Sequence, residues 1–316
     1  MSQSGPAGAD RWRKRIDGAV DFVRRRVAGD YDVDESGFDP ELMTTVLMPL
    51  FRPFYRTWFR VQMRGLQNVP ASGPALVVAN HSGVLPLDAV MLQIGLFDEH
   101  PEHRNLRLLS ADLVYEVPVL SGMARRSGYI RAERDEAERQ LAAGELVGVF
   151  PEGFKGIGKP FSQRYQLQRF GRGGFAALAR RAGVPIIPCA IVGAEEIYPM
   201  IADFPQLARR LGLPYFPITP LFPWFGLLGA VPLPSNWIIE FCPPVPADST
   251  PADAGAGGGA GADAGARGDS RARADAGARA AGGADSEAVS CLADRVRDTI
   301  QGKLDELVAE RGPAFS

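Results

Sequence analysis

Residues 74–88 read PALVVANHSGVLPLD, an apolar run followed by a polar turn and the start of a second apolar segment. The run 74–79 has the composition of a buried strand, and Pro86 is well placed to open a helix that extends to about Leu96. A strand, a turn and a helix in this order are the repeating unit of α/β proteins. The stretch therefore predicts that fold class for the chain around it.

The same alternation continues on both sides of this stretch, from Val61 to Pro246. Short apolar runs that predict strands are separated by amphipathic stretches that predict helices. Runs that are apolar throughout indicate strands buried on both faces of a sheet. We therefore expect an α/β domain over 41–246 with a central mixed sheet flanked by helices. The further predicted strands are 106–110, 146–150, 185–192 and 237–241.

Segments of different character flank or overlap this domain. Residues 1–40 contain a basic amphipathic stretch, which predicts either a helix on an anionic membrane surface or a solvated helix at the domain edge. Residues 43–59 combine arginine with aromatic side chains, which is typical of an interfacial helix, although a core helix with a charged outer face fits too. Residues 247–286, rich in Ala and Gly, predict a disordered linker, and 287–316 predict a C-terminal amphipathic helix that this linker tethers.

Composition argues against several classes of protein. Lys and Arg number 35 and Asp and Glu 37, so the formal net charge of -2 provides no bulk attraction for nucleic acid. The three cysteines are far apart, which fits neither a disulfide framework nor a zinc site and suits a reducing cytoplasm. The longest uncharged run, 211–239, contains six prolines, so we expect no straight membrane-spanning helix there. The N-terminus has no signal-peptide pattern.

Two short patterns resemble functional motifs but have simpler explanations. Residues 153–160, GFKGIGKP, nearly match the phosphate loop of nucleotide triphosphatases, but Pro160 stands where that motif needs a hydroxyl group for Mg²⁺. His100 and His103 share a proline-containing loop with no third ligand at a defined spacing, which favours a surface loop over a metal site.

His81 is the strongest candidate for chemistry among the three histidines. It follows a predicted strand, and ligands of α/β sheets bind where strands end. Asp88 would lie in the first turn of the next helix, from which its carboxylate could reach back to the imidazole. A histidine held in this way is a competent general base near neutral pH. On this pattern alone, a buried structural histidine remains the alternative.

A second strand end shows a similar pattern. Residues 146–153, LVGVFPEG, lead a predicted strand into Pro151, Glu152 and Gly153. A carboxylate and free backbone amides at this position could bind substrate hydroxyl groups or phosphate. A glycine-rich FGRGGF at 170–175 then opens a helix, whose N-terminus favours anions. Five basic residues reinforce the prediction of an anion site: Lys155, Lys159, Arg164, Arg169 and Arg172.

The order of these segments resembles the glycerolipid (lysophospholipid) acyltransferases. Asn80-His81 with a downstream aspartate, FPEG at 150–153 and VPIIP at 184–188 are similar to successive blocks of that family, and GYIR at 128–131 falls where its second block stands. The resemblance covers about residues 60–245 and implies a single acyltransferase domain. This chain departs from the usual pattern in two ways. The spacing between the histidine and the aspartate is longer, and Arg131 stands fewer residues after Gly128 than the arginine of a typical second block does.

The resemblance also implies a mechanism. His81 would deprotonate an acceptor hydroxyl group, which attacks the thioester of acyl-CoA or acyl-carrier protein, while Asp88 orients the imidazole. Arg131, with Arg134 as a further candidate, would bind the glycerol phosphate together with Glu152. No metal or redox cofactor is expected. The complete set of expected substrate-binding residues is Asn80, Ser82, Gly83, Arg131, Pro151, Glu152, Gly153, Lys155 and Pro188.

The leading hypothesis is an O-acyltransferase that converts 1-acylglycerol 3-phosphate to phosphatidate at the cytoplasmic face of the membrane, as a peripheral or monotopic protein. Glycerol 3-phosphate, another lysophospholipid and diacylglycerol stay open as acceptors. A non-catalytic lipid-binding protein and a thioesterase stay open as other functions. The expected partners are membrane lipid, the membrane surface and the acyl thioester, with acyl-carrier protein as an alternative donor. Residues 211–239 could contact lipid or form the acyl tunnel.

Overall fold

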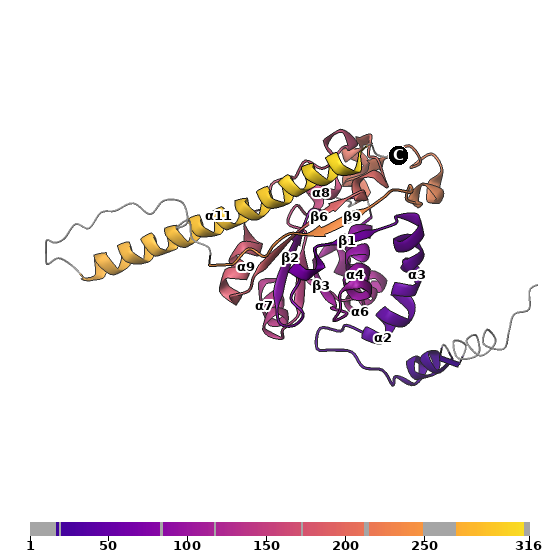
Figure 1. Cartoon of the computed structure of the whole chain (residues 1–316), viewed down its shortest axis with the longest axis horizontal. Helices are drawn as coiled ribbons and strands as arrows, with labels where there is room; N and C mark the ends of the chain where they lie inside the picture. The colour runs from indigo at the N-terminus through magenta and orange to yellow at the C-terminus, as the bar shows by residue number, and fades with distance from the viewer. Residues whose placement is uncertain are drawn as a thin grey trace, which may run out of the picture.

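The computed structural model describes residues 17–312 except 19, 83–84, 117, 172, 212–214 and 249–269 (Figure 1). A seven-stranded sheet with the order β1-β9-β6-β2-β5-β3-β4 forms its centre. Gly83 and Arg172, two of the expected site residues, lie outside the described residues. The strands of the sheet are β1 (Gln62–Arg64), β2 (Ala75–Ala79), β3 (Leu106–Ser110), β4 (Tyr129–Arg131), β5 (Leu146–Val149), β6 (Ile186–Val192) and β9 (Ile238–Phe241).

The sheet is mixed, which confirms the predicted fold class. Strands β6, β2, β5, β3 and β4 run parallel, whereas β9 pairs antiparallel with β6 and parallel with β1. The carboxyl ends of the five parallel strands therefore meet at one edge. Because Val78 pairs with Val149 of β5 and with Pro188 of β6, the turns that follow β2 and β5 lie next to each other.

Helices cover both faces of the sheet (Figure 1). Alternate residues of β2 belong to two separate cores, as expected for a strand buried on both sides: Val77 packs with α4, and Leu76 packs with α7, α9 and α11. The longer helices are α4 (Leu87–Glu99), α6 (Pro118–Arg126), α7 (Arg134–Ala142), α9 (Gly174–Ala182) and α11 (Ser270–Arg311), and the shorter ones include α5 (Leu113–Glu116), α8 (Phe154–Ile157) and α10 (Pro205–Leu211).

Residues 40–58 are helical throughout. Two π turns, η1 (Met43–Leu47) and η2 (Phe54–Trp58), flank α3 (Met48–Pro53) and follow α2 (Pro40–Leu42). A proline inside a helix removes one hydrogen bond, and a wider turn accommodates it without ending the helix. One side of the segment packs in the core through Tyr55 and Phe59, and Arg52 forms an ion pair with Asp98 of α4 at 2.7 Å. This side matches the core-helix alternative, while Leu50 and Trp58 remain exposed.

The C-terminal helix is longer than the sequence predicted. α11 begins at Ser270, so the expected linker 247–286 is wrong for residues 270–286, and 249–269 lie outside the described residues. Alanine has the highest helix propensity, so an alanine-rich segment joined to a packed helix continues that helix. The predicted apolar stripe is confirmed, since Val296, Ile300 and Leu304 are buried against the sheet.

The basic N-terminal segment lies partly outside the described residues, which begin at 17. Residues 20–28 are helical, and Val20, Val23 and Val27 are exposed. Arg26 forms an ion pair with the buried Asp39, which attaches this helix to the domain. Among the described helices, none is both long enough and apolar enough to cross a bilayer.

Candidate active site

The structure pairs the histidine that follows β2 with the aspartate in the first turn of α4. His81 Nδ1 lies 2.8 Å from Asp88 Oδ2 across a separation of seven positions. Asp88 is fully buried, and its carboxylate also accepts a hydrogen bond from the Ser82 backbone N–H at 2.9 Å. A carboxylate at Nδ1 keeps the proton on that nitrogen and leaves the Nε2 lone pair available. The long histidine–aspartate spacing therefore still produces the tautomer that a general base needs.

The imidazole is packed on one side and partly open. Its side chain is 14% exposed, and the ring stacks on Phe150 at 4.5 Å between centroids. The short helix α8 passes close to the main chain of His81, where a Cβ on Gly156 would come within 2.9 Å of the His81 carbonyl oxygen. Only glycine fits at that position. A glycine of the motif-like GFKGIGKP stretch thus allows α8 to pack against the turn that carries His81.

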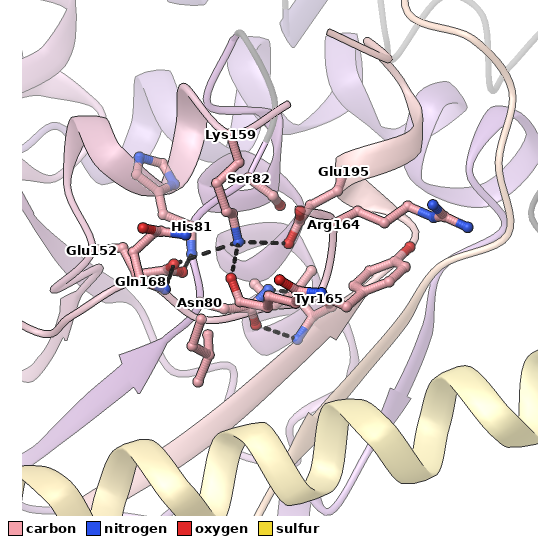
Figure 2. Close-up of polar contacts among 12 residues, drawn as sticks. Asn80, His81, Ser82, Glu152, Lys159, Arg164, Tyr165, Gln168 and Glu195 are labelled. Carbon is pink, nitrogen blue, oxygen red and sulfur yellow. Dashed lines mark hydrogen bonds and ion pairs between the residues drawn. The ribbon is translucent and has the colours of Figure 1, made fainter. Parts of the chain in front are cut away.

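Glu152, at the end of β5, is turned into the protein. It is buried, and its Oε1 accepts a hydrogen bond from the His81 backbone N–H at 3.0 Å. Its Oε2 accepts one from Gln168 N–H at 2.7 Å and lies 3.4 Å from Lys159 Nζ. Figure 2 shows this cluster, with the His81 imidazole pointing away from it. The sequence prediction gave Glu152 to the substrate, whereas its oxygens bind the protein's own groups.

Three other expected residues lie inside the protein. Asn80 is fully buried, and its amide donates to the Ile191 carbonyl at 3.0 Å and accepts from the Ile191 N–H at 2.7 Å, which joins the ends of β2 and β6. Ser82 is buried, and its hydroxyl group has no hydrogen-bond partner among the described residues. Pro188 lies within β6 beside Val78, and the alternation along the strand places it on the sheet face opposite α4.

Arg131 lies at the same sheet edge as His81 but three strands away. At about 4.8 Å per strand, the separation of the strand ends is about 14 Å. The Arg131 guanidinium group lies 5.2 Å from the centre of the Tyr115 ring, and Arg125 lies 5.4 Å from the same ring. Both guanidinium groups therefore contact the Tyr115 ring, and Arg131 Nη1 also lies 3.5 Å from Glu133 Oε1. Arg134, the further candidate, is exposed at the first position of α7.

The remaining predicted residues belong to the turn after β5. Pro151 is half-buried, and Gly153 adopts a φ of +53° directly before α8. Lys155 is exposed on α8, whereas Lys159 is buried. Of the cations predicted to form an anion site, one lysine therefore lies at the surface and the other in the interior.

Two tyrosines near Asp88 were missed by the sequence analysis. Burial raises the pKa of Tyr129, and the charge of Asp88 adds to this effect. Burial also raises the pKa of Tyr215 to about 12, with further contributions from the charges of Asp203 and Asp88. Both hydroxyl groups therefore lie close enough to Asp88 to sense its charge. The GYIR block, in which Tyr129 follows a glycine, could have indicated Tyr129. No pattern in the neighbouring sequence indicates Tyr215 as a site residue.

An apolar cavity of about 180 Å³ adjoins this region. It lies between the helical segment 43–54, α4 and α6, and Tyr129 forms part of its wall. Val90 of α4 also contributes to the wall, whereas neither His81 nor Asp88 is among the residues that line the cavity. Its size and lining suit part of a hydrocarbon chain.

The other histidines bind backbone groups. His100 Nε2 lies 3.3 Å from the Val69 carbonyl oxygen, and His103 Nδ1 lies 2.6 Å from that of Phe97. In the part of the chain that the structure describes, no cluster of three or more His, Cys, Asp or Glu side chains could hold a metal ion.

A partly open imidazole, oriented by a buried carboxylate at the carboxyl edge of an α/β sheet, defines a class of enzymes that activate a hydroxyl group or water by general-base catalysis. Sequence comparison identifies the family within this class. The family described as Acyltransferase matches residues 60–192, which include His81, Asp88 and Glu152. The chain belongs to this acyltransferase family and is an acyltransferase.

Three proteins illustrate the range of similarity to this chain. The uncharacterised protein Rv0502 of Mycobacterium tuberculosis is 49% identical over 295 residues, which cover 93% of this chain and 74% of that protein. The human DGAT1/2-independent enzyme synthesizing storage lipids is 25% identical over 169 residues, which cover 52% of this chain and 51% of that protein. The chloroplastic 1-acyl-sn-glycerol-3-phosphate acyltransferase BAT2 of Brassica napus is 26% identical over 158 residues, which cover 46% and 40%.

The crystal structure of the 1-acyl-sn-glycerophosphate acyltransferase PlsC from Thermotoga maritima aligns with a TM-score of 0.49 and 16% identity. The alignment covers 84% of this chain and 81% of PlsC.

Proposed function

We propose that the protein is an O-acyltransferase of glycerolipid synthesis, with 1-acylglycerol 3-phosphate as its first candidate acceptor and acyl-CoA or acyl-carrier protein as its donor. The observation that carries this proposal is the 2.8 Å contact between His81 and Asp88 within the acyltransferase domain. The names of two relatives support it, since the human protein is an enzyme that synthesizes storage lipids and the Brassica protein a 1-acyl-sn-glycerol-3-phosphate acyltransferase. The apolar cavity that α4 lines with Val90 and Ile94 supports a fatty acyl substrate.

In the proposed reaction, His81 Nε2 accepts the proton of the acceptor hydroxyl group while the hydroxyl oxygen attacks the thioester carbon. A carbon–oxygen bond forms, the carbon–sulfur bond breaks, and the departing thiolate takes the proton from the imidazolium. Asp88 holds the imidazole in the required tautomer and stabilises its charged form. The acyl thioester is the only co-substrate in this balance, and no metal or redox cofactor enters it.

The proposed acceptor phosphate binds toward Arg131 and Arg125. These two guanidinium groups lie over the same Tyr115 ring at the edge that carries His81. Arginine is well suited to phosphate because its planar donors can bind two oxygens at once. A neutral acceptor such as diacylglycerol would not need them. Arg131→Ala should therefore raise the KM for a phosphorylated acceptor and leave that for a neutral one unchanged.

CoA release from palmitoyl-CoA tests the proposal directly. The purified protein is assayed with each candidate acceptor and with none, in parallel with His81→Ala. Acceptor-dependent release that the substitution abolishes would support the acyltransferase, and the best acceptor would define the reaction. Release without an acceptor would indicate a thioesterase. If release is absent with every acceptor and also with acyl-carrier protein donors, the proposal fails in favour of a non-catalytic lipid-binding protein.

We further propose that the protein works as a peripheral protein on the cytoplasmic face of a membrane. Trp224 is 73% exposed, and Phe225 and Leu228 beside it are also exposed. The Trp58 indole N–H donates to the Pro232 carbonyl at 2.9 Å, which brings a further half-exposed tryptophan to this segment. Clustered exposed apolar side chains are typical of surfaces that contact lipid or protein.

Sedimentation with vesicles of phosphatidylcholine and phosphatidylglycerol tests this membrane contact. The variant Trp224→Ser/Leu228→Ser should reduce the bound fraction several-fold while it keeps activity on a short-chain acceptor that is soluble as a monomer. Equal sedimentation of the variant and the wild-type protein would contradict the contact at this segment.

A further inference from the structure

A lysine side chain lies buried next to the catalytic turn, between two carboxylates (Figure 2). Lys159 Nζ lies 3.1 Å from Glu195 Oε1, 3.1 Å from the Gln166 carbonyl oxygen and 3.4 Å from Glu152 Oε2. An ammonium group has three N–H donors and cannot be buried cheaply without partners for them. The three oxygens supply those partners. Because Glu152 also binds the His81 N–H, the lysine neutralises the carboxylate that holds the catalytic turn.

The residues 165–168, here called the strap, cross this cluster and link it to the rest of the protein. The Gln166 carbonyl accepts from Lys159, and the Gln168 N–H donates to Glu152. The backbone groups of Tyr165 and Leu167 instead bind side chains of α11. The strap thus contacts the buried cluster on one side and the C-terminal helix on the other.

Two side chains of α11 make the contacts with the strap. Gln301 donates to the Tyr165 carbonyl and accepts from the Leu167 N–H, each at 2.9 Å, and Arg297 donates to the Leu167 carbonyl at 3.2 Å. At the end of the helix, Arg311 forms an ion pair with the buried Glu196, next to Glu195. Contacts from α11 therefore reach both ends of the group of residues around Lys159.

We propose that α11 is a positioning element for catalysis, because it holds the strap, and through the strap Lys159 and Glu152, in the arrangement that fixes the main chain of His81. Gln301, Arg297 and Lys159 are positioning residues in this scheme and do not touch the substrate. The proposal rests on the proposed function for its effect on rate. Its structural part, the link between α11 and His81, stands independently.

The buried charges explain why such a link would affect the site. Burial raises the pKa of Glu195 to about 7, with the charge of Glu152 adding to it and the contact with Lys159 opposing it. One ammonium group thus serves two carboxylates, of which Glu195 changes its charge near neutral pH. If the strap moved, Lys159 would lose the Gln166 carbonyl, and Glu152 would lose the Gln168 N–H.

A matched pair of substitutions on α11 tests the proposal. Arg297→Ala removes a contact with the strap, while Arg295→Ala removes the same charge from an exposed position two residues away on the same helix. Gln301→Ala removes two strap contacts and should have the larger effect. Because small displacements at a reacting group are costly to rate, we expect kcat to fall about tenfold in Gln301→Ala and about threefold in Arg297→Ala, with KM within twofold. Arg295→Ala should match the wild-type protein.

Histidine NMR supplies a readout that does not depend on activity. The chain has three histidines, so comparison with His81→Ala assigns the His81 imidazole signals. Gln301→Ala should shift or broaden these signals at a temperature where thermal unfolding shows a fully folded protein, and Arg295→Ala should not. Unchanged His81 signals in folded Gln301→Ala would overturn the proposal and restrict α11 to a role in stability. If the wild-type protein shows no transfer, the proposed function fails, but the NMR comparison still decides this inference.

Discussion

The turns after β2 and β5 begin from the same pattern, an apolar strand followed by a polar residue, but use it in different ways. After β2, the His81 side chain is 14% exposed, and only its Nδ1 is held, by Asp88. After β5, the Glu152 side chain is fully buried and binds two backbone N–H groups and the ammonium of Lys159. One turn leaves the Nε2 atom of His81 without a protein partner among the described residues, whereas the other has both carboxylate oxygens of Glu152 occupied.

The difference indicates that two neighbouring strand ends have different roles. The turn after β2 carries the candidate general base, and the turn after β5 carries a side chain that supports it. Glu152 holds the main chain of His81 but does not lie at the open side of the imidazole. A carboxylate at a strand end is therefore not by itself a substrate-binding group, since the protein's own backbone can use its acceptor capacity. Substitutions of His81 or Asp88 should therefore change the kinetics differently from substitutions of Glu152.

The largest expected effect comes from substitution of His81, whose imidazole is partly open. His81→Ala should lower kcat by about 10²–10⁴-fold, since it removes the general base. His103→Ala is the control, because the exposed His103 imidazole contacts the Phe97 carbonyl and the Phe97 ring at the surface. CoA release under saturating substrate measures both variants. Near-normal turnover by His81→Ala would contradict the assignment of chemistry to this turn.

Asp88→Asn should have the next largest effect, a fall in kcat of about 10²-fold. Asparagine can accept a hydrogen bond from His81 but cannot stabilise the imidazolium ion by charge, and it also favours the wrong tautomer. The substitution should leave KM for the acceptor nearly unchanged, and pH–rate profiles of both proteins measure the remaining activity. A loss smaller than about threefold would show that another group orients the imidazole.

Glu152→Gln tests whether the turn after β5 supports the main chain of His81. We expect a fall in kcat of about tenfold and a lower unfolding temperature, with KM unchanged, because the loss of charge leaves Lys159 with one buried carboxylate and disturbs the hold on the turn. Steady-state kinetics and thermal unfolding separate the two possible roles. A raised KM for the phosphorylated acceptor with an unchanged kcat would instead return Glu152 to substrate binding.

The smallest expected effect is a pH dependence of stability due to Glu195. Its pKa in the folded protein is about 7, above the ordinary 4.5, so the folded state holds the proton more tightly than the unfolded state does. The contribution of this group to stability is present below pH 4.5 and is lost as pH rises toward 7. Glu195→Gln should therefore gain about 2–3 kcal/mol relative to the wild-type protein between pH 5 and pH 8. Urea unfolding at both pH values measures the difference, and a gain of the opposite sign would exclude the raised pKa.

The sequence predicted the features that local patterns encode. The apolar runs predicted five of the seven strands of the mixed sheet, and the two missed, β1 and β4, have only three residues each. The strand–turn–helix pattern around His81 placed Asp88 where the structure has it. The inward orientation of Glu152 could not be predicted, because its partners Lys159 and Gln168 are set by how the following loop folds back. The bonds of Gln301 to the strap join residues 134 and 136 positions apart, and no local pattern reports contacts of that range.

The late position of α11 in the chain also determines when the site is completed during synthesis. At about 5–20 residues per second, the 134 positions between Leu167 and Gln301 take about 7–27 s to translate. During that interval the growing chain already contains His81 and Asp88 but lacks the helix that binds the strap. If α11 has the proposed positioning role, a chain that stopped before α11 would carry His81 and Asp88 and still acylate slowly, so full activity would be gained only once α11 has left the ribosome.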